Sequence, residues 1–140
     1  MISMKIECND EKIIVYLHRY KLNIDDIDKL NKDIKTLFIK LIRVYKLPLL
    51  GYSKVIIYHN KNYGSVLEIE KIYNSEYNRD IIDLKLIIFK DTEMYLEFDD
   101  YIENKNVFFK NDKYYLDISK INSLYEYIEF GRIVYKKESF

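Results

Sequence analysis

The chain has 140 residues, of which 49% are hydrophobic and 33% charged, and its 23 basic and 23 acidic side chains cancel to a formal net charge of zero. This length fits one domain, and the composition is that of a globular protein rather than a disordered one. Zero net charge argues against a dedicated nucleic-acid-binding protein, whose affinity depends on neutralising phosphates. Nucleic acid is therefore a disfavoured partner.

The single cysteine, Cys8, cannot form an internal disulfide, which favours a reducing compartment. The first residues contain no charged segment followed by an apolar core, so no secretory signal is expected. The apolar runs are strand-sized, as at Leu86–Phe89, and none approaches the roughly 18 residues that span a bilayer. We expect a cytoplasmic protein without a membrane partner.

Ala, Gln and Trp are missing, whereas Ile, Lys, Asn and Tyr are abundant. This bias toward residues with AT-rich codons indicates an AT-rich genome, such as that of a low-GC bacterium or its phage. The many tyrosines and lysines therefore carry less weight as signs of binding.

In chain order, the first two predicted elements are strands at 2–8 and 12–18, which flank the turn-forming sequence Asn9-Asp10-Glu11. An amphipathic helix follows over residues 24–47. Its apolar side chains recur at helical spacing and form one stripe: Ile27, Leu30, Ile34, Leu37, Phe38, Leu41 and Tyr45. Asn23 is the expected N-cap, and Pro48 and Gly51 end the helix.

The rest of the chain reads as strands followed by a short helix. Strands are predicted at 54–59, 66–72, 81–89, 93–99, 107–110, 113–118 and 132–135, with a short helix as the alternative at 93–99. Ser119 can cap a last helix that carries Ile121, Leu124 and Ile128. The sequence thus predicts an α+β fold in which the long helix packs on a mainly antiparallel sheet. One globular domain, 1–140, is expected, with 73–80 as the candidate subdomain junction.

Catalytic candidates are few. His18 and His59 lie near the ends of predicted strands and could act as acid and base in RNA cleavage, which gives the alternative of a small hydrolase or ribonuclease. The other interpretation is that both are ordinary strand-end residues. Cys8 is more typical of a small buried hydrophobe than of a nucleophile. Enzyme activity is therefore not the favoured interpretation.

The acidic residues Glu97, Asp99, Asp100 and Glu103 could offer oxygen ligands to Ca²⁺ or Mg²⁺. This segment lacks the glycine and the spacing of a calcium loop, so solvated carboxylates are the favoured interpretation. The three glycines of the chain do not form a nucleotide-binding fingerprint, and one cysteine with two separated histidines does not form a typical zinc site. We expect no cofactor and no metal.

Two surfaces could bind macromolecules. The first is the basic helix face, which could contact nucleic acid but has acidic residues interleaved: Lys29, Lys32, Lys35, Lys40 and Arg43. The second is an aromatic set in the C-terminal half: Tyr95, Phe108, Phe109, Tyr114 and Tyr115. Adjacent residues of a strand point to opposite faces, so each aromatic pair places one ring on each side of the sheet. Tyrosine is enriched at binding surfaces.

The segments Met4–Glu7, Ile13–Leu17 and Val66–Glu70, with Glu129-Phe-Gly131 near the end, are similar to the start of MecA-type protease adaptors. The acidic linker typical of such adaptors is missing. The resemblance implies an adaptor function. We therefore expect a non-catalytic protein–protein interaction or regulatory module, which binds a partner protein or forms a homodimer through the aromatic set.

Overall fold

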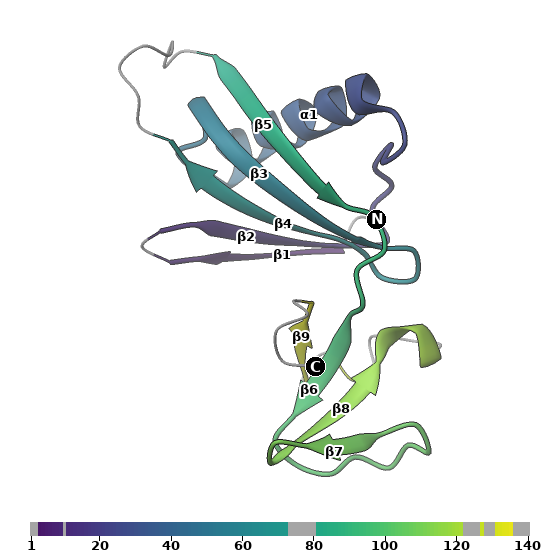
Figure 1. The fold of residues 1–140 in the computed structure, drawn as a ribbon. Coiled ribbons are helices and arrows are strands. Elements are labelled where there is room, and N and C mark those ends of the chain that lie inside the picture. The colour runs from purple at the N-terminus through teal and green to yellow at the C-terminus, as the bar shows by residue number, and fades with distance from the viewer. Residues whose placement is uncertain (1–2, 10, 73–80, 122–126, 128–130, 136–140) are drawn as a thin grey trace.

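The computed structural model describes residues 3–9, 11–72, 81–121, 127 and 131–135. These residues form an α+β fold with nine strands in two sheets and one long helix, α1 (Ile27–Tyr45) (Figure 1). Most strand pairs are antiparallel. The predicted fold class is confirmed. Among the described residues, no helix is both long enough and apolar enough to cross a membrane.

The larger sheet, here sheet A, has five strands in the order β1-β2-β4-β3-β5. The strands are β1 (Ser3–Cys8), β2 (Ile13–His18), β3 (Gly51–Asn60), β4 (Gly64–Lys71) and β5 (Ile82–Phe89). Both β2 and β3 pair antiparallel with β4, so they run parallel to each other, and α1 connects them with β4 inserted between. The last strand, β5, pairs parallel with the far side of β3.

Helix α1 begins later than the sequence predicts. Its N-cap is Asp26, whose carboxylate accepts a hydrogen bond from the backbone N–H of Lys29 at 3.2 Å. The prediction of Asn23 as N-cap is wrong, because Asn23 donates from its backbone and side chain to Asp33 at 3.0 and 2.8 Å instead. At the other end, Lys46 takes a left-handed conformation with φ 57° and donates to the carbonyl of Leu41.

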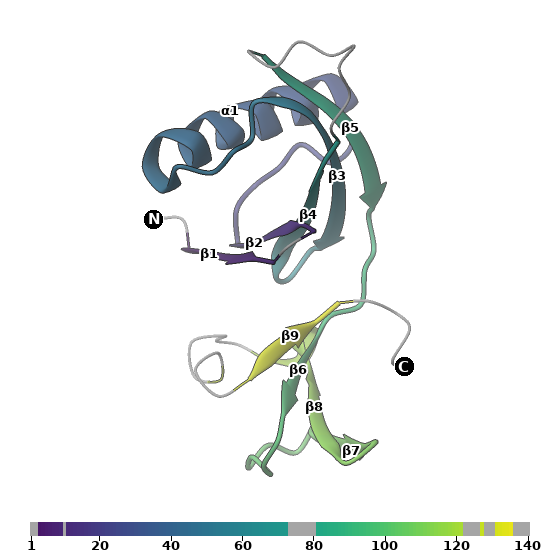
Figure 2. The same ribbon diagram turned by 90° about the vertical axis from the view of Figure 1, so that its left-hand side faces the viewer.

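The predicted apolar stripe of α1 is largely confirmed. Five of its members are buried in the cluster between the helix and sheet A: Leu30, Ile34, Leu37, Phe38 and Leu41. The two ends of the stripe, Ile27 and Tyr45, are exposed. Strands β2, β3 and β4 contribute alternate residues to the same cluster, including Val15, Leu17, Val55, Ile57, Leu67 and Ile69. Figure 2 shows α1 lying across this one face of the sheet.

Gly64 begins β4, directly after the β3–β4 turn, and it allows β2 and β4 to approach closely there. It has φ 127°, and an added Cβ would lie 2.2 Å from the carbonyl oxygen of Leu17. Next to it, the backbone N–H of Arg19 donates to the carbonyl of Tyr63 at 2.7 Å. Any side chain at position 64 would therefore force the two strands apart.

The smaller sheet, here sheet B, has four strands in the order β7-β8-β6-β9. They are β6 (Tyr95–Phe98), β7 (Phe108–Lys110), β8 (Lys113–Asp117) and β9 (Arg132–Val134). Strand rather than helix is thus found within the predicted segment 93–99. The β7–β8 turn is formed by Asn111 and Asp112, whose φ angles of 50° and 64° confirm the predicted two-residue connection.

A short 3₁₀ turn, η1 (Ile118–Lys120), follows β8, and Asp117 caps it by accepting from the backbone N–H of Ser119 at 2.9 Å. The helix that the sequence predicts after Ser119 extends over Leu124 and Ile128, which lie outside the described residues. The candidate junction at 73–80 lies outside them as well. The chain passes from sheet A to sheet B between β5 and β6 (Figure 1).

A second hydrophobic cluster lies between the two sheets. Sheet A contributes residues from the face opposite α1, namely Tyr16 and Val66, and Tyr63 of the β3–β4 turn joins them. Sheet B and its flanking residues contribute Met94, Leu96, Phe98, Leu116, Ile118 and Tyr135. Sheet A is therefore covered by α1 on one face and, near the β3–β4 turn, by sheet B on the other.

Candidate functional site

The two histidines point to opposite faces of sheet A. His18 aligns with Gly64 and shares the face of Tyr16, whereas His59 aligns with Ser65 and shares the face of Ile57. Nδ1 of His59 lies 3.0 Å from Oγ of Ser65, and the ring of His18 lies 5.3 Å from that of Tyr63. The structure does not bring the two imidazoles into one site, so we carry the acid–base pair no further.

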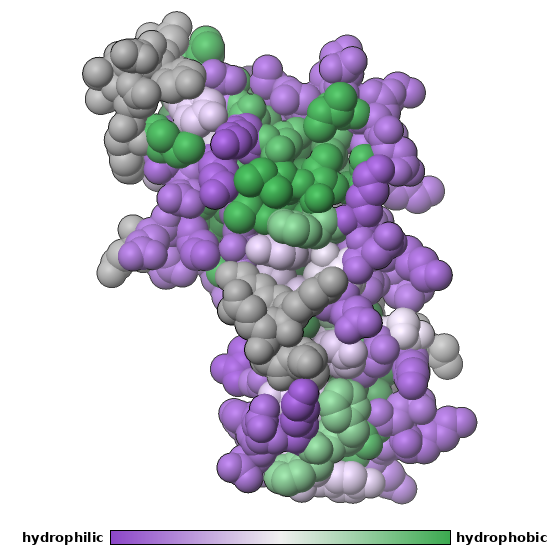
Figure 3. All heavy atoms as spheres, in the orientation of Figure 1, coloured by the Kyte–Doolittle hydropathy of each residue, from purple (hydrophilic) through white to green (hydrophobic). Residues whose placement is uncertain are grey.

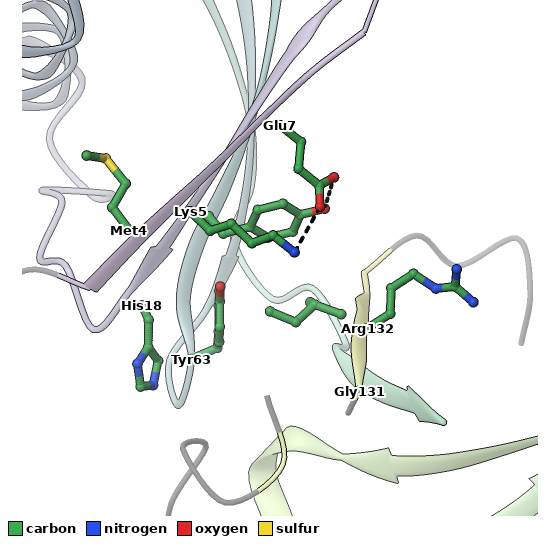
Figure 4. Close-up of a pocket in the computed structure, with 9 residues that line it drawn as sticks. Met4, Lys5, Glu7, His18, Tyr63, Gly131 and Arg132 are labelled. Atoms are coloured by element: carbon green, nitrogen blue, oxygen red, sulfur yellow. Dashed lines mark hydrogen bonds and ion pairs between the residues drawn. The ribbon is translucent and has the colours of Figure 1, made fainter. Parts of the chain in front are cut away.

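His18 lines a cavity of about 210 Å³ between the β1–β2 hairpin and the start of β9 (Figure 4). Its polar lining includes Lys5, Glu7, Tyr16 and Arg132. Glu7 forms an ion pair with Lys5 at 3.0 Å and accepts from the Tyr16 hydroxyl at 3.3 Å. The dashed lines in Figure 4 mark these two contacts. The cavity is smaller than the roughly 300–1,000 Å³ of typical ligand pockets.

Burial favours the neutral forms of the two tyrosines and the histidine that line this cavity. Burial raises the pKa of Tyr16 to about 12, and the carboxylate of Glu7 adds to the shift. Burial also raises the pKa of Tyr63, and it lowers that of His18, with a further contribution from the positive charge of Arg19. Tyrosines that stay protonated and a histidine that stays neutral hydrogen-bond well, but this set lacks an ionised nucleophile.

Behind this cavity, a buried carboxylate connects the two sheets. Glu68 lies in the middle of sheet A, between Ile14 and Ile56, and only 4% of it is exposed. It accepts a hydrogen bond from the hydroxyl of Tyr135 at 2.6 Å and forms an ion pair with Lys12 at 3.3 Å. Burial and the nearby carboxylate of Glu68 raise the pKa of Tyr135. This arrangement holds the segment after β9 against sheet A.

His59 lines a broader hollow of about 530 Å³ near the start of α1. Arg19, Lys21 and Lys61 line it too, so its rim is basic. Burial lowers the pKa of His59, whereas a hydrogen bond to Gly64 and the charges of Asp91 and Asp25 act in the opposite direction. Acidic groups thus reach the same site, and the hollow has no consistent preference for anions.

Cys8 is exposed, contrary to the expectation of a small buried hydrophobe, because it ends β1 at the edge of sheet A. It lines a cavity of about 250 Å³ together with Lys71. Nζ of Lys71 is buried and has no hydrogen bond to any residue that the structure describes, and burial lowers the pKa of this amine. No pattern in the sequence points to Lys71, because lysine at a strand end is normally solvated.

Two of the four carboxylates considered as metal ligands, Glu97 and Asp99, are paired with cations instead. Glu97 accepts from Arg132 and, at 3.1 Å, from the hydroxyl of Tyr115, and Asp99 forms an ion pair with Lys113. Through its hydrogen bond and charge, Lys113 lowers the pKa of Asp99. Among the described residues, no three His, Cys, Asp or Glu side chains are grouped as a metal site would require. This holds for Asp100 as well as for Glu97 and Asp99.

The basic residues of α1 are exposed, as the sequence predicts for a solvated face: Lys29, Lys32, Lys35, Lys40 and Arg43. Acidic neighbours interrupt them, including the N-cap Asp26 and the first-turn Asp28. Such mixing of charges weakens the attraction to a phosphate backbone. We therefore regard this face as a solvated helix surface.

The aromatic set surrounds strand β7 and its partner β8. On one face of sheet B, the ring of Phe108 lies 5.7 Å from Tyr115 and 5.9 Å from Tyr95. On the other face, the ring of Phe109 lies 5.0 Å from Tyr114. Phe108 and Phe109 are 39% and 60% exposed, whereas Tyr115 is buried. The structure therefore brings all five predicted residues together, but on two faces.

Tyr101 extends the second of these faces. Its ring lies 5.7 Å from Tyr114 at an interplanar angle of 74°, and 65% of the residue is exposed. We call Tyr95, Tyr101, Phe108, Phe109, Tyr114 and Tyr115 the β7 aromatic surface. The sequence contains Tyr101 within the aromatic run, but its contact with Tyr114 depends on the path of the β6–β7 connection, which has no periodicity to follow.

Comparison with protein-family models, with curated proteins and with solved structures finds no match to this chain. The resemblance to MecA-type protease adaptors is therefore not supported by a family match. What the chain does must be argued from its own geometry.

Proposed function

We propose that this chain is a protein-binding module that uses the β7 aromatic surface to bind a partner protein. The observation that supports this most directly is the exposure of Phe108 and Phe109 on both sides of one edge strand. Large exposed aromatic side chains cost solvation free energy in an isolated protein, and they are typical anchors at protein interfaces.

These rings are held in place before any partner binds. Phe109 rests on Tyr114, and Tyr101 packs on Tyr114 from another direction, so three rings form one cluster. A side chain that is already packed loses little rotamer freedom on binding. The cluster therefore has the composition and the rigidity of an interface hot spot.

Charged groups flank the aromatic rings on one face of sheet B, the face of Phe108 and Tyr115. Lys113 with Asp99, and Arg132 with Glu97, form ion pairs on sheet B beside the rings. A polar rim of both signs around an apolar centre is typical of a protein-binding site. The partner that fits is a protein surface with an apolar hollow that receives the exposed rings, flanked by charged groups that complement these ion pairs.

Recognition here depends on side chains rather than on strand addition. In a two-residue hairpin the flanking residues, Lys110 and Lys113, exchange the backbone hydrogen bonds. Within β7, only Phe109 therefore directs its N–H and C=O away from β8. An edge with one free residue offers too few hydrogen bonds to bind an extended peptide.

The test is to identify partners with the wild-type chain as bait and to measure their affinity for variants. We expect Phe109→Ala to raise the dissociation constant about tenfold or more, because hot-spot aromatics commonly contribute over 1.4 kcal/mol. Tyr45→Ala is the matched control, since Tyr45 is 46% exposed but lies on α1. A partner that binds both variants equally well, with both proteins folded, would contradict the proposal.

A further inference from the structure

Strand β5 leaves one long edge of sheet A open. It has eight residues and pairs with β3 on one side, and no described strand lies on its other side (Figure 1). Natural sheets protect such edges with proline, bulges or several charges. This strand contains no proline and pairs in continuous register, and its only charges are Asp83 and Lys85.

Apolar side chains remain partly uncovered along this edge. Leu84 and Leu86 pack against the cluster under α1 but are only half-buried, because β5 is the last strand. On the opposite face, Ile81 and Phe89 are exposed at the two ends of the strand. Figure 3 shows an apolar patch on that face of the upper part of the molecule. A further strand would cover these groups on both faces.

The direction of the backbone groups in β5 follows from its pairing with β3. The N–H of Gly51 donates to the carbonyl of Ile81, and the parallel register continues without interruption to Tyr58 and Phe89. Odd-numbered residues of β5 therefore direct their N–H and C=O toward β3. The even-numbered residues direct theirs outward: Ile82, Leu84, Leu86 and Ile88.

We propose that β5 pairs antiparallel with β5 of a second copy of this chain, which joins the two sheets A into one continuous sheet. The two-fold axis passes beside Leu84, which then lies opposite Leu84 of the other copy. The outward groups of Ile82 and Leu86 pair across the axis, so backbone hydrogen bonds form on both sides of it.

Charge selects this register among those that the backbone allows. With Leu84 on the axis, Asp83 of each copy lies opposite Lys85 of the other, at the non-hydrogen-bonded positions where side chains are closest. A shift that places residue 85 on the axis would bring the two Lys85 side chains together. A further shift would place each Lys85 opposite Ile87 and leave both charges unpaired.

Within the part of the chain that the structure describes, the two charged side chains of β5, Asp83 and Lys85, have no oppositely charged partner. Lys85 lies beside Lys54 of β3 instead, so an acidic neighbour from another copy would relieve that repulsion. At the opposite edge of the sheet, by contrast, Lys5 and Glu7 of β1 already pair with each other at 3.0 Å.

The remaining contacts in this register are apolar. Ile82 lies opposite Leu86 on the helix face, and Ile81 lies opposite Ile87 on the other face, where Ile81 is now exposed. Sheet B follows the C-terminal end of β5 (Figure 2), so the antiparallel arrangement places the two sheets B at opposite ends of the dimer. The β7 aromatic surface stays accessible in both copies.

Charge reversal tests the pairing. By sedimentation equilibrium we expect the wild-type chain to dimerise reversibly, and Asp83→Lys or Lys85→Asp to raise the dimer dissociation constant about tenfold or more, because like charges then lie opposite. The double variant Asp83→Lys/Lys85→Asp restores opposite charges and should restore dimerisation. A monomeric wild-type chain, or a double variant as weak as the single ones, would overturn the proposal. Circular dichroism checks that each variant is folded.

Cysteine crosslinking tests the register in a Cys8→Ser background. The double variant Asp83→Cys/Lys85→Cys should form an intermolecular disulfide, because opposed positions bring Cα atoms to about 4.5 Å. Each single variant should stay uncrosslinked. Crosslinking of Lys85→Cys alone would overturn the register. These results do not depend on the proposed function, because partner binding at β7 is measured with variants that leave β5 unchanged.

Discussion

Sheet A and sheet B obtain their stability in different ways. Sheet A has a cluster of its own, whose buried members come from α1, from alternate residues of β2, β3 and β4, and from the flanking segments. Sheet B has strands of three to five residues, and its buried side chains complete a cluster only with Tyr16, Tyr63 and Val66 of the larger unit. Sheet A thus has its own hydrophobic core, whereas sheet B depends on sheet A to bury its apolar side chains.

This difference also separates the two proposed interfaces. In sheet A, the open edge is long and regular, so its recognition elements are backbone groups spaced along β5. In sheet B, the strands are short, and recognition depends on aromatic side chains around β7. A small sheet fixed to a stable one can present large exposed rings without having to supply the main core.

The largest expected effect on stability comes from removing a side chain of the core between α1 and sheet A. Phe38 is fully buried between α1 and sheet A, so Phe38→Ala should lower the free energy of unfolding by about 3–5 kcal/mol. Because sheet B rests on sheet A, we expect both to lose protection together in hydrogen exchange. Ile39→Ala is the control, because that side chain is exposed. Loss of sheet A protection alone would contradict the dependence of one sheet on the other.

A smaller and more local effect is expected at the link between the sheets. Tyr135→Phe removes the hydrogen bond to the buried carboxylate of Glu68, which should cost about 1.5–3 kcal/mol. Amide exchange should rise mainly in β6, β8 and β9, whereas β3 stays protected. Tyr101→Phe, at an exposed tyrosine, should change neither quantity. An equal rise in all strands would show that this bond does not act locally.

The smallest effect concerns pH. Burial lowers the pKa of His18, so the unfolded chain, with its histidine near pKa 6.5, takes up a proton first as the pH falls. Stability is therefore full above about pH 6.5 and declines as the pH drops toward 5. We expect His18→Gln to flatten this decline in urea titrations at several pH values. His59 also has a lowered pKa, so the double variant should flatten it further.

Much of the fold could be predicted because its patterns are local. The stripe of α1 and the alternation in the strands identify both elements from neighbouring residues alone. The N-cap was misplaced because Asn23 and Asp26 are both suitable capping residues, and the choice depends on Asp33, which binds Asn23 from the second turn of the helix. The division into two sheets depends on which strands pair, and pairing is a long-range property.

The candidate surface was predicted in composition but not in arrangement. The pairs Phe108/Phe109 and Tyr114/Tyr115 follow from strand alternation, and the structure brings them together. Which ring is exposed depends on the layer above it, so the burial of Tyr115 and the exposure of Tyr101 could not be predicted. The opposite orientation of His18 and His59 is a matter of register, which single-strand patterns do not reveal.

The parallel pairing of β3 with β5 has a consequence for how the chain folds. Val55 pairs with Leu86, so β3 gains its second neighbour only after a long stretch of chain has been synthesised. Until then, one side of β3 is open, and Val55 and Ile57 lack their neighbours in β5. Non-local pairs of this kind slow folding and leave an aggregation-prone intermediate. We expect docking of β5 to be a late kinetic step, more sensitive to Leu86→Ala than to changes in the β1–β2 hairpin.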